Sequence, residues 1–319
     1  MLKHIFLFFF LLFTNLSLQS DNLDEIIVSG DWRDAILSEV DSSLILVTNE
    51  DIRKNQHKHF EDIAYLVPNL NFAASDSRPR YFQIRGIGER SGYEGTPNSS
   101  VGFLIDDIDF SGQAGIASVY DIDQIEIYRG PQGSRMGANS LAGMIYIKTK
   151  DPQDLFEVNG EITLGNYGRN DLSASINIPF AKNLKSRLSI RKEDFDGFRK
   201  NLFLDRGDTS KKDEQSLRLK TNWLISEDAS LDLVYFDNDF DDPADIWTID
   251  GSLNTISDRP GMDSQDSSAL GINLEFLNKL NTLKILYSET DTDVIFSYDA
   301  DWGNTQSHYP YVYDYFSET

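Results

Sequence analysis

The chain has 319 residues, a formal net charge of −23 and no cysteine. So large an acidic excess argues against a nucleic-acid partner that is held by phosphate neutralisation. The lack of cysteine excludes disulfides, thiolate metal sites and cysteine nucleophiles, and the length allows one or two domains.

The first 20 residues are typical of an export signal. Lys3 precedes an apolar block over 5–13, and the small residues Ser17 and Ser20 follow it. This order predicts a secretory signal peptide over residues 1–20, with cleavage near Ser20. A retained membrane anchor is the alternative, but the apolar block is short for a span of about 20 residues.

A short extended segment comes next, inside a linker that we place at 21–39. Its β-branched residues and acidic start predict a strand. A segment so close to the expected mature terminus can be pulled without disturbing a core. Two interpretations stay open: the first strand of the following domain, or a mobile strand that pairs with the sheet edge of a partner protein. The segment consists of Asp24, Glu25, Ile26, Ile27, Val28 and Ser29.

A helix is predicted over 48–67, between two short strands. Thr48 and Asp51 form an N-cap signal, with an acidic residue placed favourably in the first turn. His57 and His59 are two residues apart, which places them on different faces of a helix. They are therefore not expected to bind a metal ion together.

Three polar, turn-rich connections follow, over 73–83, 89–100 and 111–118. Connections of this length inside a compact domain are either functional or disordered. Some of their side chains can hydrogen-bond to a ligand or stack on it, and ordinary solvated loop residues are the alternative interpretation. These candidate ligand-binding residues are Arg78, Arg80, Arg90, Tyr93 and Gln113.

The most informative stretch is IEIYRGPQGSRMGANSLAGMIYIKTK at 125–150. Alternating apolar residues at both ends predict two strands, and the glycines between them predict a compact connection. A phosphate-binding loop would need a following helix and a Lys-Ser/Thr pair. The Lys-Ser/Thr pair is absent and the segment is expected to return to a strand, so nucleotide binding is not predicted.

This stretch resembles the last part of the plug domain of TonB-dependent outer-membrane receptors. Further pieces of the plug pattern lie upstream in the family's order, which makes the resemblance specific over residues 24–150. They are DEIIVSG at 24–30, EDIAYLVPNLNF at 61–72, FQIRGIG at 82–88 and SSVGFLIDDIDF at 99–110. The resemblance implies a mixed α+β plug domain, which we place at 40–152.

The resemblance also implies roles for single residues. Residues 24–29 resemble the TonB box, which binds the periplasmic energy transducer TonB, and the three polar connections resemble the apex that contacts the substrate. Arg85 and Arg129 each precede a glycine, and in the family the matching arginines pair with barrel carboxylates and lock the plug. Arginine suits this pairing because it can bind a carboxylate in bidentate fashion, although snorkelling at a strand end is the alternative. The family's carboxylates lie well along the barrel, so we expect these arginines to be unpaired here.

After residue 152 the pattern changes to long alternating segments. Such alternation over about ten residues is the signature of outer-membrane barrel strands, with apolar residues outward and polar residues inward. Arg187, Arg218 and Lys220 lie on the polar faces of their segments. A soluble β-sandwich has the same period, but the long strands and the mixture of short and long connections favour a barrel. The segments are 156–166, 170–180, 184–196, 214–225, 230–239, 267–279 and 282–298.

An acidic run, interpreted as part of a loop, begins within the last residues of segment 230–239 and continues into the connection expected at 240–266. It places Asp237, Asp239 and Asp241 two residues apart. This spacing is close to that of calcium-binding loops, but the central glycine and the closing glutamate are missing. We predict a hydrated loop mouth there, with calcium binding as the alternative.

Plugged outer-membrane transporters close with about 22 strands, whereas about seven are predicted here, with an eighth beginning at 311–317. So small a sheet cannot surround a plug. The predicted fold class is therefore a mixed α+β plug domain followed by antiparallel transmembrane β-barrel strands over 153–319. We expect the barrel to be incomplete, with an open wall, and the chain to be an N-terminal fragment.

The function implied by the resemblance is active uptake of a scarce solute across the outer membrane of a Gram-negative bacterium. A ferric-siderophore-type iron complex is the first expectation, and cobalamin, a glycan or another nutrient are alternatives. The implied partners are TonB, the small-molecule ligand and outer-membrane lipid. No enzymatic activity, cofactor or metal site is predicted. An alternative of another class is an exported carbohydrate-binding or carbohydrate-active β-protein.

Overall fold

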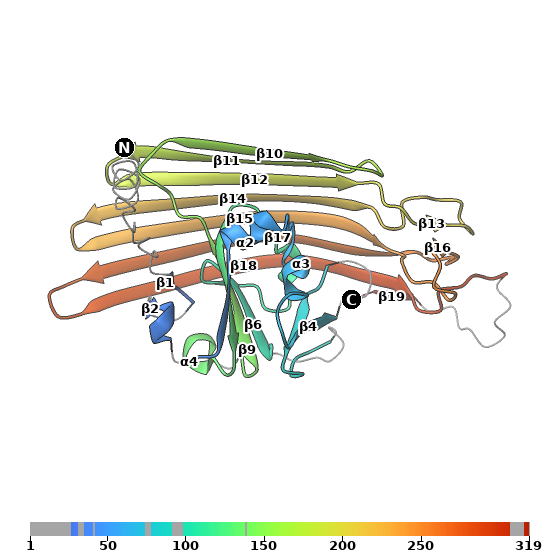
Figure 1. Cartoon of the computed structure of the whole chain (residues 1–319), viewed down its shortest axis with the longest axis horizontal. Coiled ribbons are helices and arrows are strands. Elements are labelled where there is room, and N and C mark those ends of the chain that lie inside the picture. Colours follow the sequence, from blue (N-terminus) through green and yellow to red (C-terminus); the bar gives the residue numbers. More distant parts are fainter. Residues whose placement is uncertain are drawn as a thin grey trace, which may run out of the picture.

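The computed structural model describes residues 27–30, 35–40, 42–73, 78–90, 98–137, 139–306 and 316–318. The predicted signal peptide, residues 24–26 and Tyr93 lie outside this part of the chain. A mixed sheet with short helices forms the plug region (40–152), and a long antiparallel sheet follows it (Figure 1). Among the described residues, no helix has the length and hydropathy that a membrane crossing requires.

The centre of the plug region is a 5-stranded sheet with the order β3-β8-β9-β6-β7. β6 and β9 are parallel, and the other neighbours are antiparallel. The strands predicted at the two ends of 125–150 are therefore direct neighbours, and their connection contains a short helix, α4 (Gly133–Met136). The strands are β3 (Leu44–Thr48), β6 (Val101–Ile105), β7 (Ile108–Asp109), β8 (Ile122–Arg129) and β9 (Gly143–Thr149).

The single helix predicted over 48–67 is wrong: the chain forms two helices, α2 (Asn49–Lys54) and α3 (Phe60–Ala64). Thr48 caps α2 as expected, since its Oγ1 accepts the Asp51 amide at 3.3 Å. The break has a local cause. His59 is extended, with φ −135°, and caps α3, because its Nδ1 accepts the Glu61 amide at 3.1 Å.

The plug core lies on one face of this sheet. Phe60 of α3 packs edge-on against Phe82 and Phe103, with ring centroids 5.2 and 5.5 Å away. The hairpin of β4 (Leu70–Ala73) and β5 (Tyr81–Ile84) and the turn η3 (Ala114–Ile116) contribute to the same core. The opposite face is covered by β1 (Ile27–Val28), β2 (Ala35–Ile36) and η1 (Leu37–Glu39).

The second part of the chain is an 8-stranded sheet, here called the wall sheet, with the order β10-β11-β12-β14-β15-β17-β18-β19. Each edge strand, β10 and β19, pairs with one neighbour, so the sheet is open over the described residues, as predicted. Its strands are β10 (Glu157–Leu164), β11 (Asn170–Ala181), β12 (Leu184–Phe195), β14 (Lys212–Ser226), β15 (Ala229–Ala244), β17 (Gly261–Leu277), β18 (Thr282–Asp299) and β19 (Phe316–Glu318).

The two rims of the wall sheet differ. Tight turns at 182–183, 227–228 and 278–281 lie at one rim, and longer connections at 196–211 and 245–260 lie at the other (Figure 1). The longer connections pair with each other through β13 (Lys200–Asn201) and β16 (Asn254–Thr255). The short turn between β10 and β11 shares the rim of the long connections, because antiparallel strands alternate in direction.

On β11 and β12 the wall sheet turns its polar residues toward the plug region and its apolar residues away from it. On β11, Ser173, Ser175 and Asn177 are buried, whereas Leu172 is 50% exposed. A soluble β-sandwich would bury the apolar face instead. The pattern confirms the prediction of barrel strands.

The acidic run after residue 236 was placed in the wrong element. β15 continues to Ala244, so Asp237, Asp239 and Asp241 lie on a strand and not in a loop. They stand at alternate positions of the face that carries the exposed residues of β15, and Gln215 Nε2 donates to Asp239 at 3.1 Å. In the described part of the chain, no group of three or more His, Cys, Asp or Glu side chains could hold a metal ion.

Candidate functional site: the seam between plug region and wall sheet

The interface between the plug region and the wall sheet is called the seam here. A buried bidentate ion pair across it joins Arg187 of β12 to Asp121, which precedes β8. Nε and Nη2 of Arg187 donate to the two carboxylate oxygens at 2.7 and 2.6 Å, and the side chains are 2% and 4% exposed. Ser189 donates to the same carboxylate. Burial raises the pKa of Asp121, but Arg187, Arg218 and Ser189 together lower it below its usual range. The carboxylate is therefore ionised at neutral pH.

A second cation from the wall sheet reaches the plug region nearer the rim of tight turns. Lys220 Nζ of β14 lies 3.1 Å from Asp106 Oδ1 and 2.7 Å from Asp151 Oδ1. Asp106 also accepts the Thr149 amide at 2.9 Å. Burial raises the pKa of Asp106, but Lys220 and Arg218 outweigh it, so that this pKa is lowered.

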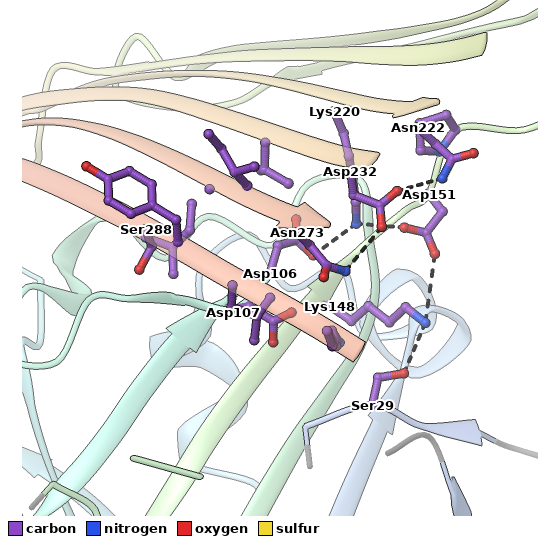
Figure 2. A pocket seen from close by; sticks show the side chains of 18 of the residues that line it. Ser29, Asp106, Asp107, Lys148, Asp151, Lys220, Asn222, Asp232, Asn273 and Ser288 are labelled. Atoms are coloured by element: carbon purple, nitrogen blue, oxygen red, sulfur yellow. Dashed lines mark hydrogen bonds and ion pairs between the residues drawn. The ribbon is translucent and has the colours of Figure 1, made fainter. Parts of the chain in front are cut away.

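A cavity of about 370 Å³ lies beside these residues, between the plug region and the wall sheet (Figure 2). Its walls are polar on both sides. Lys148 Nζ donates to Ser29 Oγ at 3.2 Å, and on the wall side Asn222 and Asn273 donate to Asp232 at 2.6 and 3.3 Å. The N-terminal segment therefore contributes directly to the lining, through Ser29.

The predicted ligand-binding residue Arg78 lies in the seam, where three carboxylates surround it. Its Nε donates to Glu214 at 2.6 Å, Nη1 to Glu61 at 3.3 Å, and Nη2 to Glu193 at 3.4 Å. Burial lowers the pKa of Arg78, but these carboxylates raise it, and the net shift is upward. Arg78 thus joins the plug region to β12 and β14.

Two more of the predicted ligand-binding residues also meet the wall sheet. Arg80 forms an ion pair with Asp263, and its Nε donates to Gln265 at 3.3 Å. Gln113 accepts a hydrogen bond from Gln265 Nε2 on its backbone oxygen at 3.0 Å, and one from Thr292 on its side chain at 2.9 Å. Arg80 and Gln113 therefore converge on Gln265 of β17.

The other predicted ligand-binding residues are not brought to this cluster. Arg90 is exposed, beyond the end of β5, and Tyr93 lies outside the described residues. The structure thus gathers Arg78, Arg80 and Gln113 at the seam, and the role of the set in ligand binding stays a prediction.

Arg85 and Arg129, the predicted lock, have no ion pair with a carboxylate in the described part of the chain. Arg85 is exposed and has φ 55°, and its backbone amide donates to Asn69 at 2.8 Å. Arg129 is half-buried, and its Nε is buried without a hydrogen-bond partner there. Their pairing with barrel carboxylates stays a prediction.

Ile27, Val28 and Ser29 are the described part of the predicted transducer-binding segment. Ile27 and Val28 pair antiparallel with Ile36 and Ala35, and Val28 packs beside Tyr128 and Met144. The segment is therefore docked on the plug region, which fits both interpretations of the sequence: a first strand, and a strand that a partner could withdraw.

His59 is the most deeply buried titratable base of the plug region. Its Nδ1 accepts the Glu61 amide, so Nε2 carries the proton and donates to the Gly115 carbonyl at 3.0 Å. Burial lowers the pKa of His59 well below its usual value, and the nearby charge of Arg78 adds to this effect. His59 is therefore a neutral cap and not a metal ligand.

No sequence pattern predicted the carboxylates on the plug side of the seam, Asp106 and Asp121. Both have positive φ, 47° and 57°, in tight connections beside strands. An acidic residue at such a turn next to an apolar strand was the available signal, because aspartate tolerates this conformation. Their partners Arg187 and Lys220 were visible as the polar members of alternating strands.

Comparison with known proteins identifies the first part of the chain. Residues 37–144 match the TonB-dependent receptor plug domain family. The chain carries a TonB-dependent receptor plug domain. Receptors of this family are not enzymes, which agrees with the prediction made from the sequence and argues against a carbohydrate-active protein.

The wall sheet matches solved receptors of the same kind. The ferric yersiniabactin uptake receptor FyuA from Yersinia pestis is 13% identical, with a TM-score of 0.69 over 81% of this chain and 42% of that one. The ferripyoverdine receptor of the outer membrane of Pseudomonas aeruginosa is 16% identical, with a TM-score of 0.68 over 88% of this chain and 38% of that one. At these identities the similarity shows the fold, a plug against a barrel wall.

A relative by sequence is the vitamin B12 transporter BtuB of Vibrio vulnificus strain YJ016. It is 24% identical over 255 residues, which are 74% of this chain and 40% of that protein. The chain thus spans less than half the length of the proteins that it matches.

Proposed function

We propose that the chain acts within a TonB-dependent outer-membrane receptor that takes up a scarce solute, with energy supplied through the periplasmic transducer TonB. The observation that carries the proposal is the charged, polar seam. Ion pairs such as Arg187–Asp121 hold the plug region against the polar face of the wall sheet. A polar seam can be rehydrated when the plug moves, whereas separating two apolar faces would cost about 25 cal/mol for each Å² exposed.

We further propose these roles for the predicted site residues. Residues 24–29 bind the transducer, and Arg78, Arg80, Arg90, Tyr93 and Gln113 contact the solute from the plug. Arg85 and Arg129 bind carboxylates of the barrel. The contacts of Arg80 and Gln113 with Gln265 support a solute site at the junction of plug and wall, because both sides present polar groups there.

The proposed solute is a ferric-siderophore-type complex. The resemblance of residues 24–150 to the receptor family supports it, and the structural neighbours FyuA and the ferripyoverdine receptor are described as receptors of ferric chelates. Cobalamin is a second candidate, which the sequence relative named vitamin B12 transporter favours. The proposal places the protein in the outer membrane, in contact with lipid, after export by the signal peptide over 1–20.

The proposal can be tested by deleting residues 24–29 from the gene in its own strain. We expect uptake to be lost while binding of the solute at the cell surface is retained, because the deletion removes the energy input and leaves the solute site intact. Growth of deletion and parent strains on defined ferric chelates, or with cobalamin as the limiting nutrient, identifies the solute. Unchanged uptake after the deletion would contradict the proposal.

A further inference from the structure

The carboxylate of Glu126 lies at the point where the N-terminal segment meets the plug sheet. Its Oε1 accepts the Ser29 amide and its Oε2 accepts the Gly30 amide, both at 2.8 Å. Two neighbours on the same face of β8 complete the set: Gln124 Nε2 donates to Oε1 at 2.6 Å, and the Tyr128 hydroxyl donates to Oε2 at 2.7 Å.

The buried carboxylate of Glu126 is held by hydrogen bonds and not by an ion pair. The residue is fully buried, and no ion pair to it occurs among the described residues. The two cations that contact the N-terminal segment have other carboxylate partners: Arg135 pairs with Asp107, and Lys148 lies 3.8 Å from Asp151. Burial of a carboxylate is costly unless hydrogen bonds replace its water. Backbone amides of the N-terminal segment supply two of the four hydrogen bonds described above.

The rest of the docking is also mediated by backbone atoms. Gln124 Nε2 donates to the Ile27 carbonyl at 2.8 Å, and Arg135 Nε donates to the Gly30 carbonyl at 3.3 Å. Gly30 has no room for a side chain, since a Cβ would lie 2.7 Å from the Tyr128 ring and 2.8 Å from Glu126 Oε2. The plug sheet therefore grips the main chain of 27–30 closely.

We propose that Glu126 is a positioning residue that clasps the main chain of Ser29 and Gly30 and sets the point at which the N-terminal segment is released. This inference rests on the proposed role of residues 24–29 in binding the transducer. Tension on 24–28 would reach the plug sheet at the bond from Gln124 to the Ile27 carbonyl and then at the paired amide bonds to Glu126. Ser29 leaves both Glu126 and Lys148 when the clasp opens, which removes Ser29 from the lining of the 370 Å³ cavity at the seam.

Single-cysteine labelling tests the clasp, because the chain has no cysteine of its own. Val28 is 2% exposed under the clasp and its neighbour Ile27 is 51% exposed. Val28→Cys therefore reports release of the segment, and Ile27→Cys reports the reactivity of a freely accessible thiol. Ala142→Cys, at a buried position of the plug core, reports opening of the whole plug. Maleimide labelling rates are measured on the full chain in membrane fragments, where both faces are accessible.

Two variants open the clasp from opposite sides. Glu126→Gln replaces one acceptor oxygen by a donor, and Gly30→Ala forces the segment away without changing the plug core. We expect each to speed labelling of Val28→Cys by about 5- to 150-fold, the factor that corresponds to one unsatisfied buried polar group. Labelling of Ala142→Cys should stay slow in both.

The matched control is Glu89→Gln. Glu89 is also buried in the plug and accepts a backbone amide, that of Ser100, at 3.1 Å, but it does not touch the segment. It should leave labelling of Val28→Cys unchanged. The proposal is overturned if Glu89→Gln accelerates this labelling as much as Glu126→Gln, if neither clasp variant accelerates it, or if Ala142→Cys accelerates in parallel. The assay needs neither transducer nor solute, so its outcome is separate from that of the deletion of 24–29.

Discussion

The plug region and the wall sheet use the same residue alternation in opposite senses. In the plug, Ile125 and Ile127 of β8 are fully buried in an apolar core. In the wall sheet, Ser189 and Arg191 of β12 are buried, and the intervening Ile190 is exposed. The difference follows from the surroundings of each sheet: the plug excludes water from its own interior, whereas the wall has a polar lumen and an apolar exterior.

This contrast determines how the two parts are joined. Buried ion pairs and hydrogen bonds cross the seam at Arg187, Lys220 and Arg78. An apolar patch accompanies them, because Val234, Phe236, Phe240 and Ala269 of the wall sheet belong to the same buried cluster as the plug core. Within it, Phe236 packs edge-on against Phe110 at a centroid distance of 5.8 Å. The plug region is therefore joined to the wall sheet by buried ion pairs together with a small apolar patch.

The largest expected effect tests whether the plug has an independent core. Phe60→Ala should lower the free energy of unfolding of the plug by about 3–5 kcal/mol, because it leaves a cavity among Phe82 and Phe103. Leu172→Ala, on the outer face of the wall sheet, should change it by less than about 0.5 kcal/mol. Urea titration of the Ala142→Cys reporter measures both. Equal effects would mean that plug and wall unfold as one unit.

The seam itself is tested by Arg187→Leu, which leaves the buried carboxylate of Asp121 without its main partner. Loss of one member of a buried pair costs about 3 kcal/mol, at the lower end of the usual range because Ser189 still donates to Asp121. Lys192→Leu is the matched control on the same strand. Lys192 is half-exposed and faces outward, and pairs of that kind contribute less than about 1 kcal/mol. The measurement is protease resistance of the plug in urea. Equal losses of resistance in both variants would contradict a stabilising role of the Arg187–Asp121 pair.

Much of the fold could be predicted because alternation and turn residues are local signals. The wall strands from 156 to 298 and the strand pair around the glycine-rich connection were visible in this way. The split between α2 and α3 was not, because the capping role of His59 depends on a carbonyl from η3, far along the chain. The extension of β15 through Asp241 was also hidden, since acidic residues resemble a loop unless the neighbouring strands are known.

The site was less predictable than the fold. A sequence shows which arginines exist but not which carboxylates they meet, so Arg78 was assigned to a ligand and not to Glu214. Glu126 lies between two isoleucines in a strand, where a glutamate would be expected to face water. Its burial depends on the return of the N-terminal segment over β8, which no local pattern reveals.

The pH dependence of stability tests the burial of His59 in the plug core. The pKa of His59 is lowered in the folded state, so below about pH 6.5 the unfolded chain binds a proton that the folded chain does not. Stability should fall with decreasing pH by up to about 1.4 kcal/mol per pH unit in this window. The lowered pKa values of Asp106 and Asp121 act only below about pH 4. His59→Asn keeps an acceptor for the Glu61 amide and should abolish the slope, and an unchanged slope would exclude His59 as its source.

The smallest expected effect concerns the N-terminal cap of α2, which is formed by residues of the plug region. Thr48 and Asp51 form a reciprocal capping box at the start of α2, on the exposed side of the plug. Thr48→Ala should lower the free energy of unfolding of the plug by about 1 kcal/mol, and Thr48→Ser, which keeps the hydroxyl, should restore most of it. The same urea titration of Ala142→Cys measures both variants. The hydrogen bonds that form the cap lie within Thr48 and Asp51, so its loss should not add to the effect of Arg187→Leu beyond simple summation. A clear departure from additivity would show that α2 and the seam are coupled, and the cap would then not act within the plug region alone.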